Sequence, residues 1–239
     1  MTLLEAIDQR TSVRRYTDQI IEESKISEIK KAIRKYNREA GLSIEFLEDG
    51  SAAFSSFLHT MGRFSGVKSL ILLKGKTDVE DLKEKLGRYG ELILLQALSL
   101  GLGSCWVSGS MNRKCAELQV ADGEQLAAVI TLGYARTSRP ADMINNLKHK
   151  KSLKKLYISD STPPEWFLAG VQAARRAPSA LNLQPVKFFY INGVVLASVR
   201  KIHKPQLMDL GIAKSHFELA ADGRFDYGNG GLLVRQQQE

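Results

Sequence analysis

The stretch YGELILLQALSLGLGSCWVSG, residues 89–109, joins one of the longest apolar runs of the chain to a segment of small residues. From Lys85 to Leu100, apolar side chains occupy nearly every face of a helix, which predicts a helix buried in a protein core. Gly101 and Gly103 predict its end, because glycine is the usual residue just past a helix C-terminus. One Gln and one Ser interrupt the run, which is also too short to span a bilayer. We therefore expect a buried helix and no transmembrane segment.

The composition of the whole chain is that of an ordinary globular protein. Its 239 residues include 34 Lys and Arg against 26 Asp and Glu, a net charge of +8, and 44% are hydrophobic. This balance excludes a disordered tail and allows one sizeable core or two small cores packed together. Cys105 and Cys115 are too few for a disulfide framework, and the N-terminal MTLLEAIDQR lacks the apolar region of a signal peptide. We expect a cytoplasmic protein that does not bind membranes.

The sequence on both sides of residues 89–109 predicts alternating helices and strands. Helices are expected where apolar residues recur at helical spacing, and strands where short apolar or β-branched runs end near glycine. Before the stretch, the helices are expected at residues 3–9 and 22–36 and the strands at residues 43–48 and 67–75. After it, a strand is expected at residues 126–135, followed by helix, strand and helix at residues 163–176, 186–193 and 207–221.

The elements after residue 140 repeat the order of those before it. All six prolines lie between Pro140 and Pro205, so the composition changes at this point. EIKKAIRKY followed by SIEFLEDG parallels VQAARRAPS followed by VKFFYING, and YGELILLQALSLGLG parallels LGIAKSHFELAADGR. Two amphipathic helix-strand units can also look alike by chance, but we interpret the recurrence as a degenerate duplication, with halves at residues 1–139 and 140–239.

The segment RTSVRRY, Arg10–Tyr16, places three arginines, a threonine and a serine close together. Guanidinium groups bind phosphate with two parallel hydrogen bonds, and the hydroxyl of Ser12 can add another. The alternative is a solvated turn in which Ser12 caps the next helix. On these residues alone, the solvated turn is favoured.

The segment APSALNLQP, residues 177–185, is a rigid polar connection between a predicted helix and a predicted strand. Ser179, Asn182 and Gln184 offer hydrogen-bond donors and acceptors on a backbone stiffened by Pro178 and Pro185. Such a loop suits recognition of a heterocycle edge, and an uneventful helix-to-strand connection is the equal alternative.

The segment GLGSCWVSGS, residues 101–110, surrounds Trp106 with small residues. The backbone amides of Val107, Ser108 and Gly109 can therefore approach a planar ligand, while the indole supplies apolar area. The alternative is a helix end followed by a loop with one core tryptophan. Cys105 belongs to no CxxC pair and has no histidine near it in sequence, so a nucleophilic or redox role is disfavoured.

Metal-binding and nucleic-acid-binding functions are not supported by the sequence. The four histidines are scattered without the spacing of metal ligands. Basic residues are spread along the chain, no DNA-binding motif is present, and aromatic residues are not interleaved with the basic runs. We expect no metal and no nucleic-acid partner; a phosphate-bearing small ligand accounts better for a few of the positive charges.

Taken in order, RTSVRRY, YGELILLQALSLGLGSCWVSG, TLGYA, APSALNLQP and MDLGIAKSHFELAADG resemble the FMN-dependent nitroreductase family. They are most similar to its single-chain, TM nitroreductase-like branch, in which two half-domains are fused. The resemblance covers almost the whole chain. It implies an α+β fold, with a central, mostly antiparallel sheet flanked by helices and two pseudo-twofold-related halves in one chain.

The resemblance also implies a set of flavin-binding residues and no catalytic side chain. Arg10 and Ser12 would bind the FMN phosphate or ribityl region, and Arg14 the pyrimidine edge of the ring. Thr11 stands where the family usually has arginine, and Val186 replaces a frequent aromatic residue. The remaining implied contacts come from Trp106, Val107, Ser108 and Gly109 beside the ring, from Pro178, Ser179, Ala180, Asn182 and Gln184 over it, and from Lys150 near the phosphate.

One flavin site per chain is implied, because the places that match these loops in the opposite halves, KYNREAGLS and ADGRFDYGN, have lost the motif residues. The implied function is an FMN-dependent oxidoreductase that takes hydride from NADH or NADPH and passes it through flavin N5 to a nitroaromatic or quinone by ping-pong chemistry. A monomer with an internal pseudo-dimer is the expected state. The alternatives are a flavin-binding carrier or regulator without turnover, and a family offshoot that fragments flavin or removes halogen.

Overall fold

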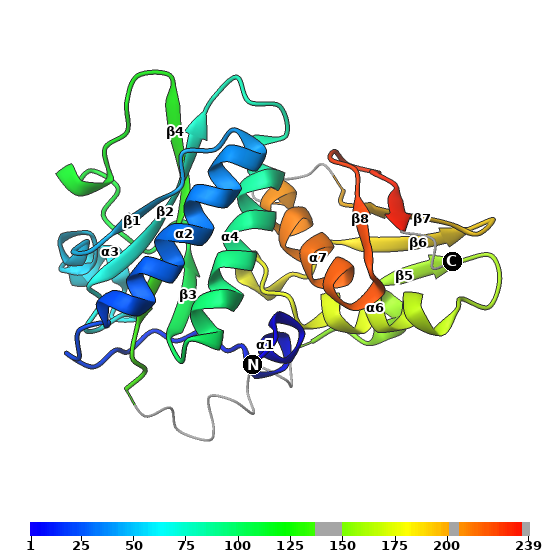
Figure 1. The fold of residues 1–239 in the computed structure, drawn as a ribbon, viewed down its shortest axis with the longest axis horizontal. Coiled ribbons are helices and arrows are strands. Elements are labelled where there is room, and N and C mark those ends of the chain that lie inside the picture. The colour runs from blue at the N-terminus through cyan, green and yellow to red at the C-terminus, as the bar shows by residue number, and fades with distance from the viewer. Residues whose placement is uncertain (137–149, 201–205, 236–239) are drawn as a thin grey trace. The chain divides into compact units, whose positions relative to one another are not determined.

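The computed structural model describes residues 1–136, 150–200 and 206–235 (Figure 1). The chain divides into two compact units, and we describe each by itself. The N-terminal unit comprises residues 10–82 and 93–144, and the C-terminal unit comprises residues 1–9, 83–92 and 145–239. The half-domain boundary expected at residues 139 and 140 lies outside the described residues.

A four-stranded antiparallel sheet forms the N-terminal unit. Its strands lie in the order β1 (Glu45–Leu47), β2 (Ser69–Lys76), β4 (Glu124–Gly133) and β3 (Gly103–Val107). Helix α2 (Glu23–Ala40) lies across one face of this sheet in Figure 1 and buries an apolar stripe that includes Ile26, Ile29 and Ile33.

The other face of the sheet is covered by a second apolar cluster. Leu70 and Leu72 of β2 pack there with Phe54, Val107 and Val129. Phe54 ends a short 3-10 turn (Ser51–Phe54), and α3 (Phe57–Thr60) follows it. Because both faces are covered, β2 is buried at nearly every position, which explains why its sequence is a continuous apolar run.

Strand β3 differs from the expectation that GLGSCWVSGS is a loop. Gly103–Val107 pairs with the end of β4, from Gly133 to Val129. The physical reason lies in the neighbouring chain segment: a Cβ added at Gly103 would lie 2.8 Å from the Val13 side chain, and Val13 N donates to Ser104 O at 2.9 Å. The small residues thus let a further extended segment lie against β3.

The C-terminal unit repeats the same strand order on a smaller scale. β6 (Lys187–Ile191) and β7 (Val194–Ser198) form a hairpin, and β8 (Gly223–Phe225) pairs with β9 (Leu233–Arg235). An isolated bridge pairs Leu196 of β7 with Leu232, the residue just before β9. The strands then lie in the order β6-β7-β9-β8, which corresponds to β1-β2-β4-β3 in the N-terminal unit. β5 (Tyr157–Ser159) adds a parallel strand at the β6 edge.

Aromatic side chains fill the core of the C-terminal unit. Helices α6 (Glu165–Arg176) and α7 (Gln206–Ala221) supply Phe167 and Phe217, and the strands supply Phe188 and Phe225. The rings of Phe188 and Phe217 are stacked at 4.8 Å, and Phe217 also meets Phe225 at 5.3 Å. Helix α1 (Leu3–Gln9) packs against α6 and α7.

Helix α4 (Leu82–Ser99) is the buried helix expected from the sequence, and its first half belongs to the C-terminal unit. There it meets α7 with the two backbones almost in contact. A Cβ added at Gly87 would lie 2.2 Å from Met208 O, and one added at Gly211 would lie 2.0 Å from Glu84 O. Only glycine allows this approach, because the obstacle in each case is backbone.

Buried polar pairs flank this helix crossing. Lys214 Nζ donates to Glu84 Oε1 at 2.6 Å, and both side chains are almost fully buried. His216 Nε2 and Glu91 Oε1 are 2.8 Å apart. These partners stand on α4 and α7, so their hydrogen bonds fix the register in which the two helices pack. None of the described helices is both long and apolar enough to cross a membrane.

Substitution of Gly211 by alanine is predicted to destabilise the protein by about 3 kcal/mol or more. The added methyl group has to displace the Glu84 carbonyl, and no rotamer change relieves that clash. Urea unfolding measures the loss. Gly109→Ala is the control, because nothing lies within 4 Å of its added Cβ, and its stability should stay within about 0.5 kcal/mol of the parent. Equal stability of Gly211→Ala and the parent would contradict the close crossing.

Candidate functional site

The arginine-rich segment of residues 10–16 is extended and bound to strand β3. Ser12 forms a parallel bridge with Ser104, and the Val13 amide donates to Ser104 O. Tyr16 anchors the end of the segment: its buried hydroxyl lies 2.6 Å from Thr131 Oγ1 and donates to Val13 O at 2.6 Å. Burial raises the pKa of Tyr16 above its ordinary range, so it stays a neutral hydrogen-bonding group.

Arg10 and Arg14 both act electrostatically on the middle of β3. Burial raises the pKa of the Cys105 thiol, and the positive charges of Arg14 and Arg10, with a hydrogen bond from Ser12, oppose that rise. The Nε of Arg10 is buried and has no hydrogen-bond partner among the described residues. A buried guanidinium N–H without an acceptor is costly, so this atom fits a site that takes an anionic or carbonyl oxygen.

Burial changes at the end of β3, from buried residues on the strand to exposed residues just after it. Val107 is buried and Trp106 is half-buried, whereas Ser108 and Gly109 are exposed. An alanine Cβ would meet nothing at Gly109, so the packing inside the unit does not explain the glycine. Together with Thr11, which is half-buried, these residues form one group in the N-terminal unit.

The loop of residues 178–184 in the C-terminal unit has an unusual backbone. Leu181, Asn182 and Gln184 have positive φ angles of 51°, 55° and 45°, a region that non-glycine residues seldom occupy. The loop is held by the Ser179 hydroxyl, which accepts from Gln184 N at 2.9 Å. Positive φ at three residues indicates that the surrounding contacts dictate the shape of the loop.

The Gln184 side chain is one of those contacts. It is buried, accepts from Lys151 N at 2.7 Å and donates to Arg175 O at 3.0 Å. Both ends of its amide group are therefore hydrogen-bonded inside the protein, and they hold the loop against Lys151 and Arg175. The side chain of Lys150 reaches the residue just before the loop and donates from Nζ to Ala177 O at 2.9 Å.

Asp209 was not among the residues expected from the sequence. It lies in the first turn of α7, is 5% exposed, and accepts from Ala180 N at 3.0 Å. Burial raises the pKa of this carboxyl to about 6, and the Ala180 hydrogen bond opposes part of the rise. One feature of the sequence could have indicated Asp209: it is an acidic residue at the start of an otherwise apolar helix, in MDLGIAKSHF.

The expected site residues thus fall into two groups, one in each unit. The structure brings together the segment of residues 10–14 and β3 in the N-terminal unit, and Lys150 and the loop of residues 178–184 in the C-terminal unit. Among the described residues, no cluster of three His, Cys, Asp or Glu side chains is arranged to hold a metal ion.

Comparison with known proteins gives the family. The family model described as "Putative TM nitroreductase" matches residues 2–221. The chain belongs to this nitroreductase family. Its α+β architecture agrees with the fold that the sequence motifs implied. No curated protein matches the chain.

Solved structures support the nitroreductase fold. A structure of a putative nitroreductase from Thermotoga maritima is 23% identical, with a TM-score of 0.64, over 98% of this chain and 92% of that one. A mutant of an FMN- and NADPH-dependent nitroreductase from Sphigopyxis sp. strain HMH is 16% identical, with a TM-score of 0.53, over 68% and 100%. A putative nitroreductase in complex with FMN from Desulfovibrio desulfuricans is 21% identical, with a TM-score of 0.50, over 68% and 99%.

Asp209→Asn is predicted to remove a pH-dependent loss of stability. The folded-state pKa of about 6 lies above the ordinary value of 3.8, so the unfolded chain ionises first as the pH rises. The parent should therefore lose up to about 3 kcal/mol of unfolding free energy between pH 4 and pH 7, relative to the variant. Urea unfolding of both proteins at several pH values measures this difference. Parallel stability curves would show that Asp209 does not titrate in this range.

Proposed function

We propose that the protein is an FMN-dependent NAD(P)H oxidoreductase of the nitroreductase type. The observation that carries the proposal is the buried Nε of Arg10, which has no hydrogen-bond partner among the described residues and belongs to the extended segment, with Ser12 and Arg14, that lies against β3. Family membership supports it, as do two proteins of similar fold: one is described as FMN- and NADPH-dependent, and the other contains FMN. Each group offers the kinds of side chain that bind a flavin: arginine and hydroxyl groups for its phosphate, and polar and apolar groups for its ring.

FMN, when bound, supplies a ring nitrogen that takes hydride from NADH or NADPH and returns it to an electron-poor acceptor such as a nitroaromatic or quinone, in ping-pong order. The protein then needs to bind and orient, and no side chain has to act as nucleophile or general base. Arg10 and Ser12 are proposed to bind the phosphate or ribityl oxygens. Arg14 is proposed to bind the pyrimidine edge, and Thr11 to lie beside it.

The end of β3 is proposed to lie along the edge of the ring. Ser108 and Gly109 are exposed, and their N–H groups are proposed as donors to a planar ligand, while Val107 and Trp106 supply apolar contact. A fixed N–H donor stabilises negative charge that develops nearby, and it does so without reorganising when the charge appears.

The loop of residues 178–184 is proposed to cover the other part of the flavin. Pro178, Ser179, Ala180 and Asn182 would make the contacts, while Gln184, already engaged with Lys151 and Arg175, keeps the loop in shape. Lys150 is proposed to add positive charge near the phosphate while it remains bonded to Ala177 O. Holding the loop rigid before binding reduces the entropy lost when the cofactor binds.

Arg10→Ala/Ser12→Ala is predicted to lose FMN. The double substitution removes the guanidinium and the hydroxyl proposed for the phosphate region, so affinity for FMN should fall at least about a hundredfold. Absorbance of the purified protein and fluorescence titration with FMN measure the loss. Arg34→Ala, an exposed arginine on α2 of the same unit, is the control and should bind FMN like the parent.

Turnover separates the enzyme from a flavin carrier. The parent should oxidise NADH or NADPH faster than free FMN at the same concentration, with menadione or a nitroaromatic as acceptor. A protein that binds FMN without exceeding the free flavin would be a carrier. A protein that takes up no FMN would contradict the proposal as a whole.

We also propose one flavin per chain and a cytoplasmic monomer, with the C-terminal unit standing in for the partner subunit of a dimer. The repeated order β1-β2-β4-β3 and β6-β7-β9-β8 supports this proposal. Sedimentation equilibrium is predicted to give the mass of one chain, 26.6 kDa, and titration to give one FMN per chain. A mass of two chains, or two FMN per chain, would contradict it.

A further inference from the structure

Three chain segments that each carry an arginine meet at one edge of the N-terminal unit. Tyr16 N donates to Ser65 O at 2.9 Å and Ser65 N donates to Arg14 O at 3.0 Å, so residues 14–16 pair with the segment that contains Arg63. On the other side, Arg136 N donates to Arg15 O at 2.9 Å. Arg15 thus lies on the middle one of three adjacent extended segments.

The pairing places the side chains of Arg15 and Arg136 directly opposite each other. Tyr16 bridges Ala135 in antiparallel fashion, which makes residues 15 and 136 the neighbouring cross-strand pair. Like charges in this position destabilise a sheet. Nothing in the fold of this unit requires an arginine at either position, since both side chains are exposed.

Arg63 adds a third positive charge to the same exposed face. Ser65 bridges Arg15, so their side chains share a face, and residue 63 lies two positions earlier on that face. The alternate residues point inward: Tyr16 is buried, and Phe64 packs on Phe54 with ring centroids 5.2 Å apart. We call Arg15, Arg63 and Arg136 the arginine face.

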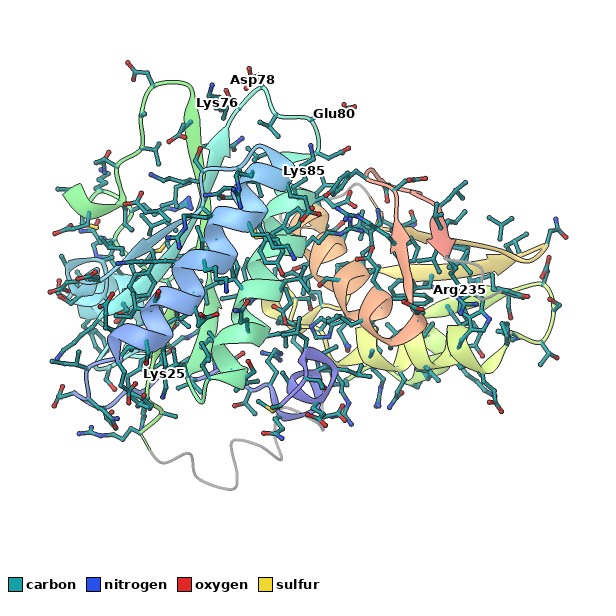
Figure 2. The ribbon with its side chains drawn as sticks, in the orientation of Figure 1. Lys25, Lys76, Asp78, Glu80, Lys85 and Arg235 are labelled. Carbon is teal, nitrogen blue, oxygen red and sulfur yellow. The ribbon has the colours of Figure 1, made fainter. Side chains whose placement is uncertain are left out.

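The arginine face forms no ion pair among the residues that the structure describes. No ion pair within 4.0 Å involves any of the three arginines. A carboxylate on a neighbouring element, Glu22, is engaged by the Tyr134 hydroxyl and by Lys25, 3.2 Å away. Figure 2 shows Lys25 at the start of α2. The charge of the face is therefore left for a ligand.

We propose that the arginine face binds a phosphate monoester dianion. The planar guanidinium groups of Arg15 and Arg136 can each make two parallel hydrogen bonds to phosphate oxygens, and a ligand of charge −2 offsets the repulsion between them. The source of the phosphate is either free inorganic phosphate or a nucleotide. A nucleotide source would be the 2′-phosphate of NADPH, and that reading alone rests on the proposed function.

The residues of the arginine face differ from the proposed flavin contacts. Arg15 is on the opposite side of the extended segment from Arg14 and Ser12, because successive residues of such a segment alternate. Arg63 and Arg136 belong to neither of the groups expected to bind flavin. The probes are titrated into protein that carries one equivalent of FMN, so that the phosphate site proposed at Arg10 and Ser12 is filled first.

Calorimetric titration of the purified full-length protein with inorganic phosphate and with adenosine 2′-monophosphate tests the proposal. Both probes should bind, and Arg15→Gln/Arg136→Gln should weaken both at least about tenfold. The control Arg34→Gln removes an exposed arginine of the same unit and should change neither. Equal affinity for the two probes would identify phosphate itself as the ligand, and tighter binding of the adenosine compound would identify a nucleotide.

One further variant tests whether the planar guanidinium is needed. Arg136→Lys retains the charge but not the planar fork, so it should weaken binding less than the double substitution does. No binding by the parent, or unchanged binding in Arg15→Gln/Arg136→Gln, would overturn the proposal.

The thermal midpoint gives an independent readout. Removing one of two opposed like charges relieves repulsion, so Arg136→Gln should unfold at the same temperature as the parent or higher. Phosphate should raise the midpoint of the parent and not that of the double variant, because only a protein that binds the ion is stabilised by it. An equal rise in both proteins would count against the site.

Discussion

The contact of α4 with α7 at Gly87 and Gly211 is the constraint on which the C-terminal unit depends. Each glycine lies against the backbone of the other helix, so the two are equivalent positions of one crossing. The pairs Lys214 with Glu84 and His216 with Glu91 flank that contact. Burial lowers the pKa of Lys214, and the facing carboxylate of Glu84 opposes the change. The crossing thus carries a buried ion pair between the two helices.

Helix α4 connects this crossing to the rest of the chain. Its first half packs within the C-terminal unit, and the continuous helix then runs into the N-terminal unit, where Gly101 and Gly103 lead into β3. Strand β3 in turn carries the segment with Arg10 and Ser12. Likewise, the first turn of α7 carries Asp209, which holds the loop of residues 178–184 by accepting from Ala180 N. Within each unit, the group of proposed flavin-binding residues is therefore connected to one of these helices, through β3 in one unit and through Asp209 in the other.

Much of the fold was predictable because it rests on periodicity and on residue type. The sequence indicated α2, α4, α6 and α7 by their apolar spacing, β2 by a short apolar run that ends at glycine, and β4 by its β-branched content. Strand β3 was missed because it is made of small residues whose pairing depends on the distant Val13 and β4. Strands β8 and β9 have three residues each, too few to show a pattern. In the site, the motifs indicated most of the candidate residues. The role of Asp209 and the hydrogen bonds of the Gln184 side chain depend on tertiary contacts that no local pattern encodes.

The central claim is that this chain binds FMN and uses it to oxidise a nicotinamide donor. The absorbance spectrum of the purified protein, recorded before and after anaerobic addition of NADH or NADPH, tests that claim most directly. The account predicts the absorbance bands of an oxidised flavin, bound by the residues near Arg10, and their bleaching by one or both donors. A colourless protein that takes up no added FMN, or a bound flavin that neither donor reduces, would contradict it.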